Sequence, residues 1–147
     1  MKIIKADLIE RFKLGDFDAI AHGCNCFCKM RSGVAKAVSD AFPEANHIDY
    51  YTTKGDINKL GTYTVVKVLD KKYIYNLYTQ YNYGYDGKLY LYYDALSLCF
   101  KKLNHTLKGL SLGIPKLGCG LAGGDWKIVK KIIEQSCPDL DITVCYL

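Results

Sequence analysis

The sequence lacks any apolar segment long enough to cross a membrane. A bilayer-spanning helix needs about 20 consecutive apolar residues, and even the apolar stretch 110–117 is interrupted by Gly113, Pro115 and Lys116. The N-terminus also lacks the charged and then apolar layout of a secretory signal. We therefore expect this chain to have no membrane partner.

The sequence also lacks the cysteine patterns of disulfide scaffolds and of zinc modules. Its seven cysteines are an odd number, whereas a disulfide framework uses an even one. Cys24, Cys26 and Cys28 lie two residues apart, whereas structural zinc sites are built from Cys-x2-Cys pairs with a second ligand pair. We expect a reduced, cytoplasmic protein with no metal and no cofactor, and a zinc site at these three cysteines is the alternative.

Neither sign of charge dominates the chain. Lysine and arginine number 20 against 15 acidic residues, and the lysines are spread out rather than gathered in a run. This balance suits an anionic ligand without requiring nucleic acid. The 13 tyrosines could stack on bases, but most fall in alternating or helical apolar patterns that indicate packing. Nucleic acid is therefore not expected as a partner, and a steep fall of affinity with salt would reveal it.

No repeat or low-complexity linker divides the 147 residues, so we expect one domain over residues 1–147, acting as a monomer. A helix should open at Gly33 and stop before Pro43, and apolar residues at helical spacing predict two more, over 93–107 and from Trp126 to Ile133. Such alternation predicts an α/β fold with three layers, α/β/α, around a central mixed sheet. Strand patterns cover residues 1–6, 17–24, 62–69, 73–78, 110–115 and 141–146.

Two unusual loops, residues 23–33 and 117–124, each leave a strand and enter a helix. In such sheets ligands lie beyond the carboxyl ends of the strands, so both loops should face one crevice. The glycine loop (residues 117–124) has four glycines between Gly118 and Gly124, and its amides can therefore approach a ligand without interfering side chains. The helix starts add unpaired amides and positive dipole ends. The pattern predicts a diphosphate site, and a plain glycine-rich turn is the alternative.

Three familiar phosphate motifs do not fit. No Gly-Lys-Ser/Thr follows the glycines, and the first strand-to-helix turn lacks a dinucleotide fingerprint. A cysteine-dependent phosphatase would place five residues between its cysteine and its arginine, but four separate Cys26 from Arg31 and six separate Cys24 from Arg31. These spacings argue against all three classes.

Residues 20–26, 32–38, 114–126 and 142–147 together resemble the macro domains, and the likeness runs nearly end to end. The branch that looks closest is that of the small ADP-ribose 1''-phosphate phosphatases, with the terminal ADP-ribosyl-glutamate hydrolases as relatives. The resemblance implies a protein that binds ADP-ribose or a derivative and hydrolyses ADP-ribose 1''-phosphate to ADP-ribose and phosphate. A non-catalytic reader of ADP-ribose and a hydrolase of ADP-ribosylated protein are the alternatives.

The same resemblance implies the contacts of the ligand. Asp7 would accept a hydrogen bond from the adenine amino group, and Asn25 would hold the distal ribose. The stretch 30–32 is poorer in glycine than in the phosphatase branch, which adds Arg31 as a phosphate contact. The full ligand-binding set comprises Asp7, Leu8, Gly23, Cys24, Asn25, Met30, Arg31, Ser32, Gly33, Val34, Ala35, Leu117, Gly118, Cys119, Gly120, Leu121, Ala122 and Gly123.

The expected catalytic pair is His22 and Asn25. His22 sits where the phosphatase branch places a histidine, and a group that titrates near neutral pH can protonate a leaving hydroxyl while Asn25 orients the ribose. An internal hydrogen bond is the alternative role of His22. Asp125 either positions water or acts as a favourable carboxylate in the first turn of a helix.

Two further places bear on the chemistry. The lysine nucleophile and the aspartate of the glutamate-ADP-ribosyl hydrolases correspond here to Gln80 or Tyr81 and to Ala122, so that mechanism is not expected. Cys119 lies inside the expected phosphate cradle, where it either packs as a small residue or is sensitive to oxidation.

Overall fold

The computed structural model describes all 147 residues and contains one six-stranded sheet with the strand order β1-β6-β5-β2-β4-β3. Neighbouring strands are parallel except for the antiparallel pair β3–β4, which confirms a mixed sheet. The strands are β1 (Lys2–Lys5), β2 (Ala19–Cys24), β3 (Tyr63–Val68), β4 (Lys72–Tyr78), β5 (Ser111–Ile114) and β6 (Asp141–Tyr146).

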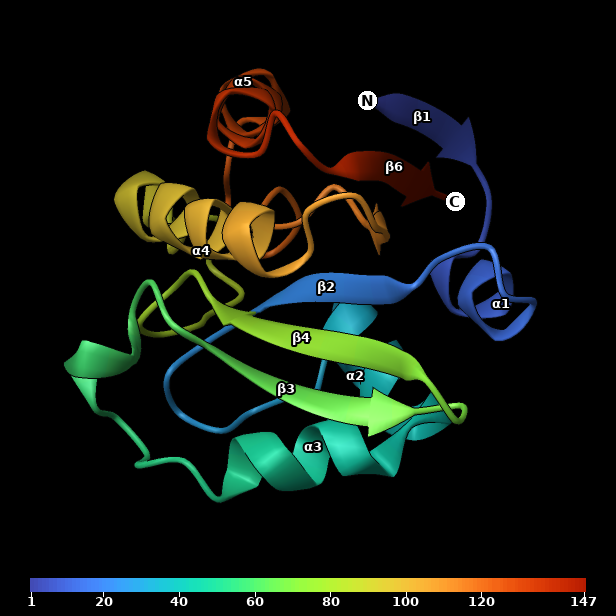
Figure 1. Cartoon of the computed structure of the whole chain (residues 1–147). Helices are drawn as coiled ribbons and strands as arrows, with labels where there is room; N and C mark the ends of the chain where they lie inside the picture. The colour runs from blue at the N-terminus through green and yellow to red at the C-terminus, as the bar shows by residue number, and fades with distance from the viewer.

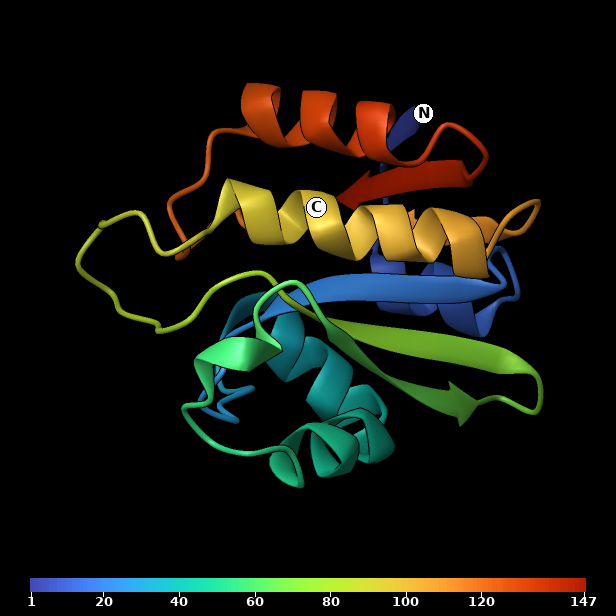
Figure 2. The same cartoon turned by 60° about the vertical axis from the view of Figure 1, so that its left-hand side comes forward.

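Helices cover both faces of this sheet. Figures 1 and 2 show α4 and α5 on one face and α2 and α3 on the other, which confirms the three-layer α/β/α arrangement. None of the helices is long and apolar enough for a membrane span. The helices are α1 (Leu8–Lys13), α2 (Gly33–Ala41), α3 (Pro43–Tyr50), α4 (Tyr93–Thr106) and α5 (Trp126–Ser136), with a short 3-10 helix, η1, at Ile57–Lys59.

The central strand β2 serves both layers because successive side chains of a strand point to opposite faces. Ala19 and Ala21 pack in the core beneath α4 and α5, whereas Ile20 packs in the core beneath α1, α2 and α3. A strand that is apolar on both sides is typical of a parallel strand covered by helices. The apolar run of the sequence therefore places β2 in the middle of the molecule.

Parallel pairing brings three loops to one edge of the sheet. In the register of β2, Cys24 lies opposite Tyr78 of β4, and Ala19 lies opposite Leu112 of β5. The carboxyl ends of these strands consequently meet, as do the segments that follow them. The segment after β1 and the C-terminus reach this edge side by side, because β1 pairs in parallel with β6 (Figure 1).

The sequence patterns did not predict α3. The helix that opens at Gly33 does end before Pro43, as expected, but Pro43 is itself the first residue of α3. Proline suits that position because the first amides of a helix have no partner inside it. Only Ala45 and Asp49 of this helix are buried, so no apolar stripe marks it in the sequence.

Candidate functional site

A cavity with two joined chambers lies at the carboxyl edge of the sheet. The larger chamber encloses about 520 Å³ and the smaller about 300 Å³, within or at the edge of the range of small-molecule sites. The expectation that the two unusual loops face one crevice is thus confirmed. The wall that both chambers share consists of Gly23, Ser32, Ala35, Gln80, Leu121 and Ala122.

The far end of the larger chamber is formed by the segment after β1 and by the C-terminus. Asp7 and Leu8 lie just after β1, Tyr146 is the last residue of β6, and Leu147 follows it. Asp7 is the N-cap of α1, and its Oδ1 accepts a hydrogen bond from the amide of Glu10 at 3.0 Å. The other carboxylate oxygen has no protein partner, so Asp7 can accept a hydrogen bond from a ligand in the chamber.

The glycine loop lines the larger chamber with backbone donors. The amides of Gly118, Gly120, Leu121 and Ala122 donate to no protein acceptor, and all four residues line the chamber. Gly118 adopts a φ of +75°, which glycine reaches without strain. A row of free amides of this kind is suited to an anion.

The start of α2 supplies a second set of free donors. Ser32 is the N-cap residue, but its side chain makes no capping bond. The amides of Gly33, Val34 and Ala35 have no protein acceptor, and these residues also line the larger chamber. Together with the positive end of the helix dipole they favour negative charge there.

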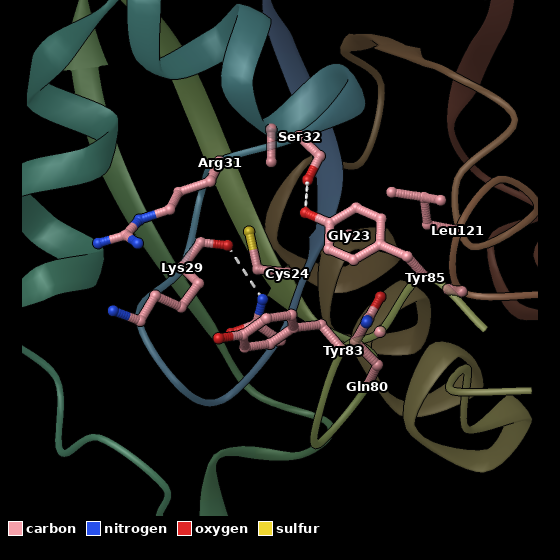
Figure 3. Close-up of a pocket in the computed structure, with 13 residues that line it drawn as sticks. Gly23, Cys24, Lys29, Arg31, Ser32, Gln80, Tyr83, Tyr85 and Leu121 are labelled. Carbon is pink, nitrogen blue, oxygen red and sulfur yellow. Dashed lines mark hydrogen bonds between the residues drawn. The ribbon is translucent and has the colours of Figure 1, made fainter. Parts of the chain in front are cut away.

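The smaller chamber is cationic. Lys29 and Arg31 line it from the segment after β2, and Tyr83 and Tyr85 from the segment after β4 (Figure 3). No carboxylate side chain lines this chamber. The positive charges are therefore not neutralised locally, and the chamber is electrostatically suited to an anionic group.

Asn25 lines the smaller chamber but is only 8% exposed. Its Nδ2 donates to the carbonyl of Lys29 at 3.0 Å, and its Oδ1 accepts from the amide of Phe27 at 2.9 Å. The side chain thus shapes its own loop, and the second hydrogen on Nδ2 remains for a ligand.

His22 does not have the surroundings expected of an acid–base group. It is 1% exposed, and its Nε2 lies 2.6 Å from Oδ1 of Asn76. Burial lowers the pKa of His22 to about 4, although the bond to Asn76 opposes the shift. The imidazole is therefore neutral at pH 7, and it is almost fully buried although His22 lies in the wall of the larger chamber. These features fit the internal hydrogen bond, and they argue against proton donation to a ligand.

Two of the expected ligand-binding residues lie away from both chambers. Met30 is 6% exposed and packs in the core with Val38 and Phe42, because the chain turns inward between half-buried Lys29 and exposed Arg31. Gly123 donates its amide to the carbonyl of Gly120 and faces the backbone of Lys88 instead of the cavity. All the other residues of the expected set line one chamber or the other.

Sequence reasoning missed the third wall of the cavity, the tyrosine loop (residues 80–91). Gln80, Tyr83 and Tyr85 line the smaller chamber, and the carbonyl of Ala122 accepts the amides of Tyr90 at 2.7 Å and Leu91 at 3.1 Å. The glycines and Asp86 of residues 80–88 predict only a loop. The available signal was that it follows β4, a strand whose carboxyl end lies at the same edge as that of β2.

The thiols near the site are protonated and inert. Burial raises the pKa of Cys24 well above its usual value, and that of Cys26 to about 11. Sγ of Cys26 donates to the carbonyl of Gln80 and Sγ of Cys28 to that of Asp49, so the three neighbouring cysteines have different partners. Burial also raises the pKa of Cys119 to about 11, consistent with a small packing residue.

Asp125 has the structural role that its position in the helix suggested. It is the N-cap of α5, and its Oδ1 accepts a hydrogen bond from the amide of Lys127 at 2.9 Å. The residue lines neither chamber. Its carboxylate is therefore used to begin α5.

The segment after β2 rests on a buried lysine. Nζ of Lys59 donates to the carbonyl of Cys26 at 3.1 Å and to Oγ1 of Thr52 at 2.6 Å. Asp49, also buried, accepts a hydrogen bond from the hydroxyl of Tyr78 at 2.8 Å. These contacts hold the backbone beside Asn25 from below.

Comparison with known proteins identifies relatives along nearly the whole chain. An uncharacterized 17.5 kDa protein from the tk-vs intergenic region of Enterobacteria phage T4 is 36% identical, over 98% of this chain and 94% of that one. ADP-ribose glycohydrolase OARD1 from Homo sapiens is 28% identical, over 96% of this chain and 88% of its own. A crystal structure of a protein from Bacteroides thetaiotaomicron matches with a TM-score of 0.85 and 25% identity, over 100% and 99% of the two chains.

A family model described as Macro domain matches residues 21–133. The match covers most of the chain and includes the start of α2 and the glycine loop, the two sources of free amides in the larger chamber. The chain therefore belongs to the macro domain family.

Proposed function

We propose that this macro domain binds ADP-ribose and hydrolyses ADP-ribose 1''-phosphate to ADP-ribose and phosphate. One observation carries the proposal: a chamber with free backbone amides on two sides opens into a smaller chamber with two cations and no carboxylate. The first chamber suits a diphosphate, and the second suits a further phosphate at the far end of the ligand.

The ligand would lie along the cavity with adenine at the far end of the larger chamber, between the segment after β1 and the C-terminus. The free oxygen of Asp7 would accept a hydrogen bond from the adenine amino group, as the resemblance to macro domains implies. The diphosphate would lie between the amides of Gly33–Ala35 and those of the glycine loop, each set aimed at one side of it. The distal ribose would then pass the wall that the chambers share and reach Asn25 in the smaller chamber.

A phosphate on that ribose would enter the smaller chamber. Water adds to phosphorus, the bond between phosphorus and the ribose oxygen breaks, and the departing hydroxyl takes a proton. Phosphoryl transfer depends chiefly on positioning and on stabilising the charge of the phosphoryl oxygens. Lys29 and Arg31 supply the positive charge that stabilises the phosphoryl oxygens, and Asn25 orients the ribose. Since His22 is almost fully buried and neutral, we assign solvent as the source of this proton and give His22 the structural role of a hydrogen bond to Asn76.

The hydrolysis of ADP-ribosylated protein is the second candidate, because one relative carries the name ADP-ribose glycohydrolase. The places that correspond to the lysine and aspartate of the glutamate-ADP-ribosyl hydrolases are Gln80 or Tyr81 and Ala122. Gln80 and Ala122 line both chambers, whereas Tyr81 lines neither and donates its hydroxyl to the carbonyl of Gly55. Neither Gln80 nor Ala122 has a side chain that is a nucleophile or a base. The site therefore favours the phosphate ester over that covalent mechanism.

The test is the release of phosphate from ADP-ribose 1''-phosphate. We expect turnover by the wild-type protein, and a loss of at least about tenfold in kcat/KM for Lys29→Gln and for Arg31→Gln, because each removes a charge-assisted contact worth about 1.5 kcal/mol or more. Lys36→Gln is the matched control, since Lys36 pairs with Asp40 on the surface of α2 and lines neither chamber.

Three results would contradict the proposal. Tight ADP-ribose binding without release of phosphate would make the protein a reader. Release of ADP-ribose from modified protein, but no release of phosphate, would favour the second candidate. Equal losses in Lys36→Gln and Arg31→Gln would show that overall charge, and not the smaller chamber, determines the rate.

A further inference from the structure

The hydroxyl of Ser32 is not where its position in the helix would place it. Ser32 is the N-cap of α2 and has the extended backbone of such residues, with φ −145° and ψ 159°. A serine there ordinarily accepts a hydrogen bond from the second or third amide of the helix. Here it makes no such bond, and its Oγ lies 2.6 Å from the hydroxyl of Tyr85 (Figure 3).

Tyr85 is held in place by a braced loop. The carboxylate of Asp86 accepts hydrogen bonds from the hydroxyl of Tyr90 at 2.9 Å and from the amide of Lys88 at 3.2 Å. Beyond these residues the tyrosine loop is bonded to the glycine loop through the carbonyl of Ala122. The bond from Tyr85 to Ser32 therefore links the two sets of free amides.

We propose that Tyr85 is a positioning residue for ligand binding. Its hydroxyl holds the Ser32 hydroxyl away from the amides of Val34 and Ala35, the second and third of α2, and so leaves them open to a ligand phosphate. The identity of that ligand rests on the proposed function. The arrangement of Ser32, Tyr85 and the two amides does not.

Removing the Tyr85 hydroxyl frees Ser32 to cap its own helix. A ligand phosphate must then displace this cap before it reaches the same amides. The competition weakens ADP-ribose binding by about fivefold, the ratio that corresponds to a typical N-cap bond. The structure of the cavity walls is otherwise unchanged, because Tyr85 is 69% exposed.

A double-mutant cycle tests this role by calorimetry with ADP-ribose. Tyr85→Phe should bind about fivefold more weakly than wild type. In the Ser32→Ala background no cap can form, so adding Tyr85→Phe should cause no further loss. Tyr51→Phe is the matched control, because Tyr51 is 85% exposed and its hydroxyl contacts no protein group.

Hydrogen exchange of the Val34 and Ala35 amides gives a second readout that needs no ligand. Exchange should slow in Tyr85→Phe and return to the wild-type rate in the double variant. Unchanged exchange in Tyr85→Phe would overturn the proposal, as would unchanged ADP-ribose affinity or an equal loss of affinity in both backgrounds, which would mean direct contact with the ligand. If wild type does not bind ADP-ribose, the proposed function fails, and the exchange experiment still decides the role of Tyr85.

Discussion

At the scale of single residues, His22 illustrates how burial sets chemistry. An imidazole that titrates near pH 6.5 in an unfolded chain is here enclosed against Asn76, with a pKa of about 4. The folded protein must therefore keep His22 neutral in mildly acidic solution. The consequence is a dependence of stability on pH that a surface histidine would not give.

We predict that the free energy of unfolding falls as the pH drops from 6.5 to 4. Over this interval His22 binds a proton in the unfolded chain but not in the folded chain, so acid favours unfolding. The contribution of His22 is fully present above pH 6.5, and about 3 kcal/mol of it is lost by pH 4. Urea unfolding at a series of pH values measures it.

The control isolates His22 from other titrating groups. Burial raises the pKa of Asp49, so its contribution to the free energy of unfolding changes with pH in the opposite direction. This contribution is the same in all the variants compared. His22→Gln should flatten the profile, whereas His47→Gln, on the exposed side of α3, should keep it. Parallel profiles for wild type and His22→Gln would contradict the assignment.

At the scale of elements, the glycine loop combines two requirements. Its free amides need close access to the ligand, and its far side packs against the tyrosine loop. Gly123 has a φ of +76°, and a Cβ there would lie 2.6 Å from the carbonyl oxygen of Lys88. Gly120 has neither constraint, since a Cβ would meet nothing within 4 Å.

We predict that Gly123→Ala destabilises the fold by at least about 1 kcal/mol, because an L residue is strained at positive φ and must also push Lys88 away. Separating the two loops should weaken ADP-ribose binding as well. Gly120→Ala should leave the free energy of unfolding within about 0.5 kcal/mol of wild type. Urea unfolding compares the two variants, and equal stabilities would show that the loops are not packed as described.

At the scale of the whole molecule, the cavity collects segments from both ends and the middle of the chain. Residues after β1 and β6 form one end of the larger chamber, and the loops after β2, β4 and β5 form the rest. A ligand that contacts all of them binds only the folded chain. Its binding energy is therefore added to the stability of the entire domain.

We predict that ADP-ribose at 100 times its dissociation constant stabilises the protein by about 2.7 kcal/mol. For a domain of this size the melting temperature should rise by roughly 5 to 11 °C. AMP at the same concentration should give a smaller shift, because it reaches only part of the cavity. Thermal unfolding checks both ligands, and a melting temperature unmoved by ADP-ribose would contradict the assignment of the cavity.

Local patterns in the sequence were sufficient to predict the layers and the two loops that face the cavity. The apolar run of β2, the spacing of Leu96, Phe100 and Leu103 in α4, and the glycine loop all express local rules of period and backbone freedom. Where such elements alternate, the parallel sheet and its ligand edge follow.

The contacts that individual residues make depend on the fold and not on local patterns. The burial of His22, the inward turn of Met30, and the bond from Tyr85 to Ser32 each join residues far apart in the chain, and no local pattern encodes such distances. The helix α3 was hidden for a related reason, since it is held by buried Asp49 and Ala45 and not by an apolar stripe. Periodicity reports which face of an element is apolar, whereas burial, pKa and hydrogen-bond partners depend on which elements the fold brings against it.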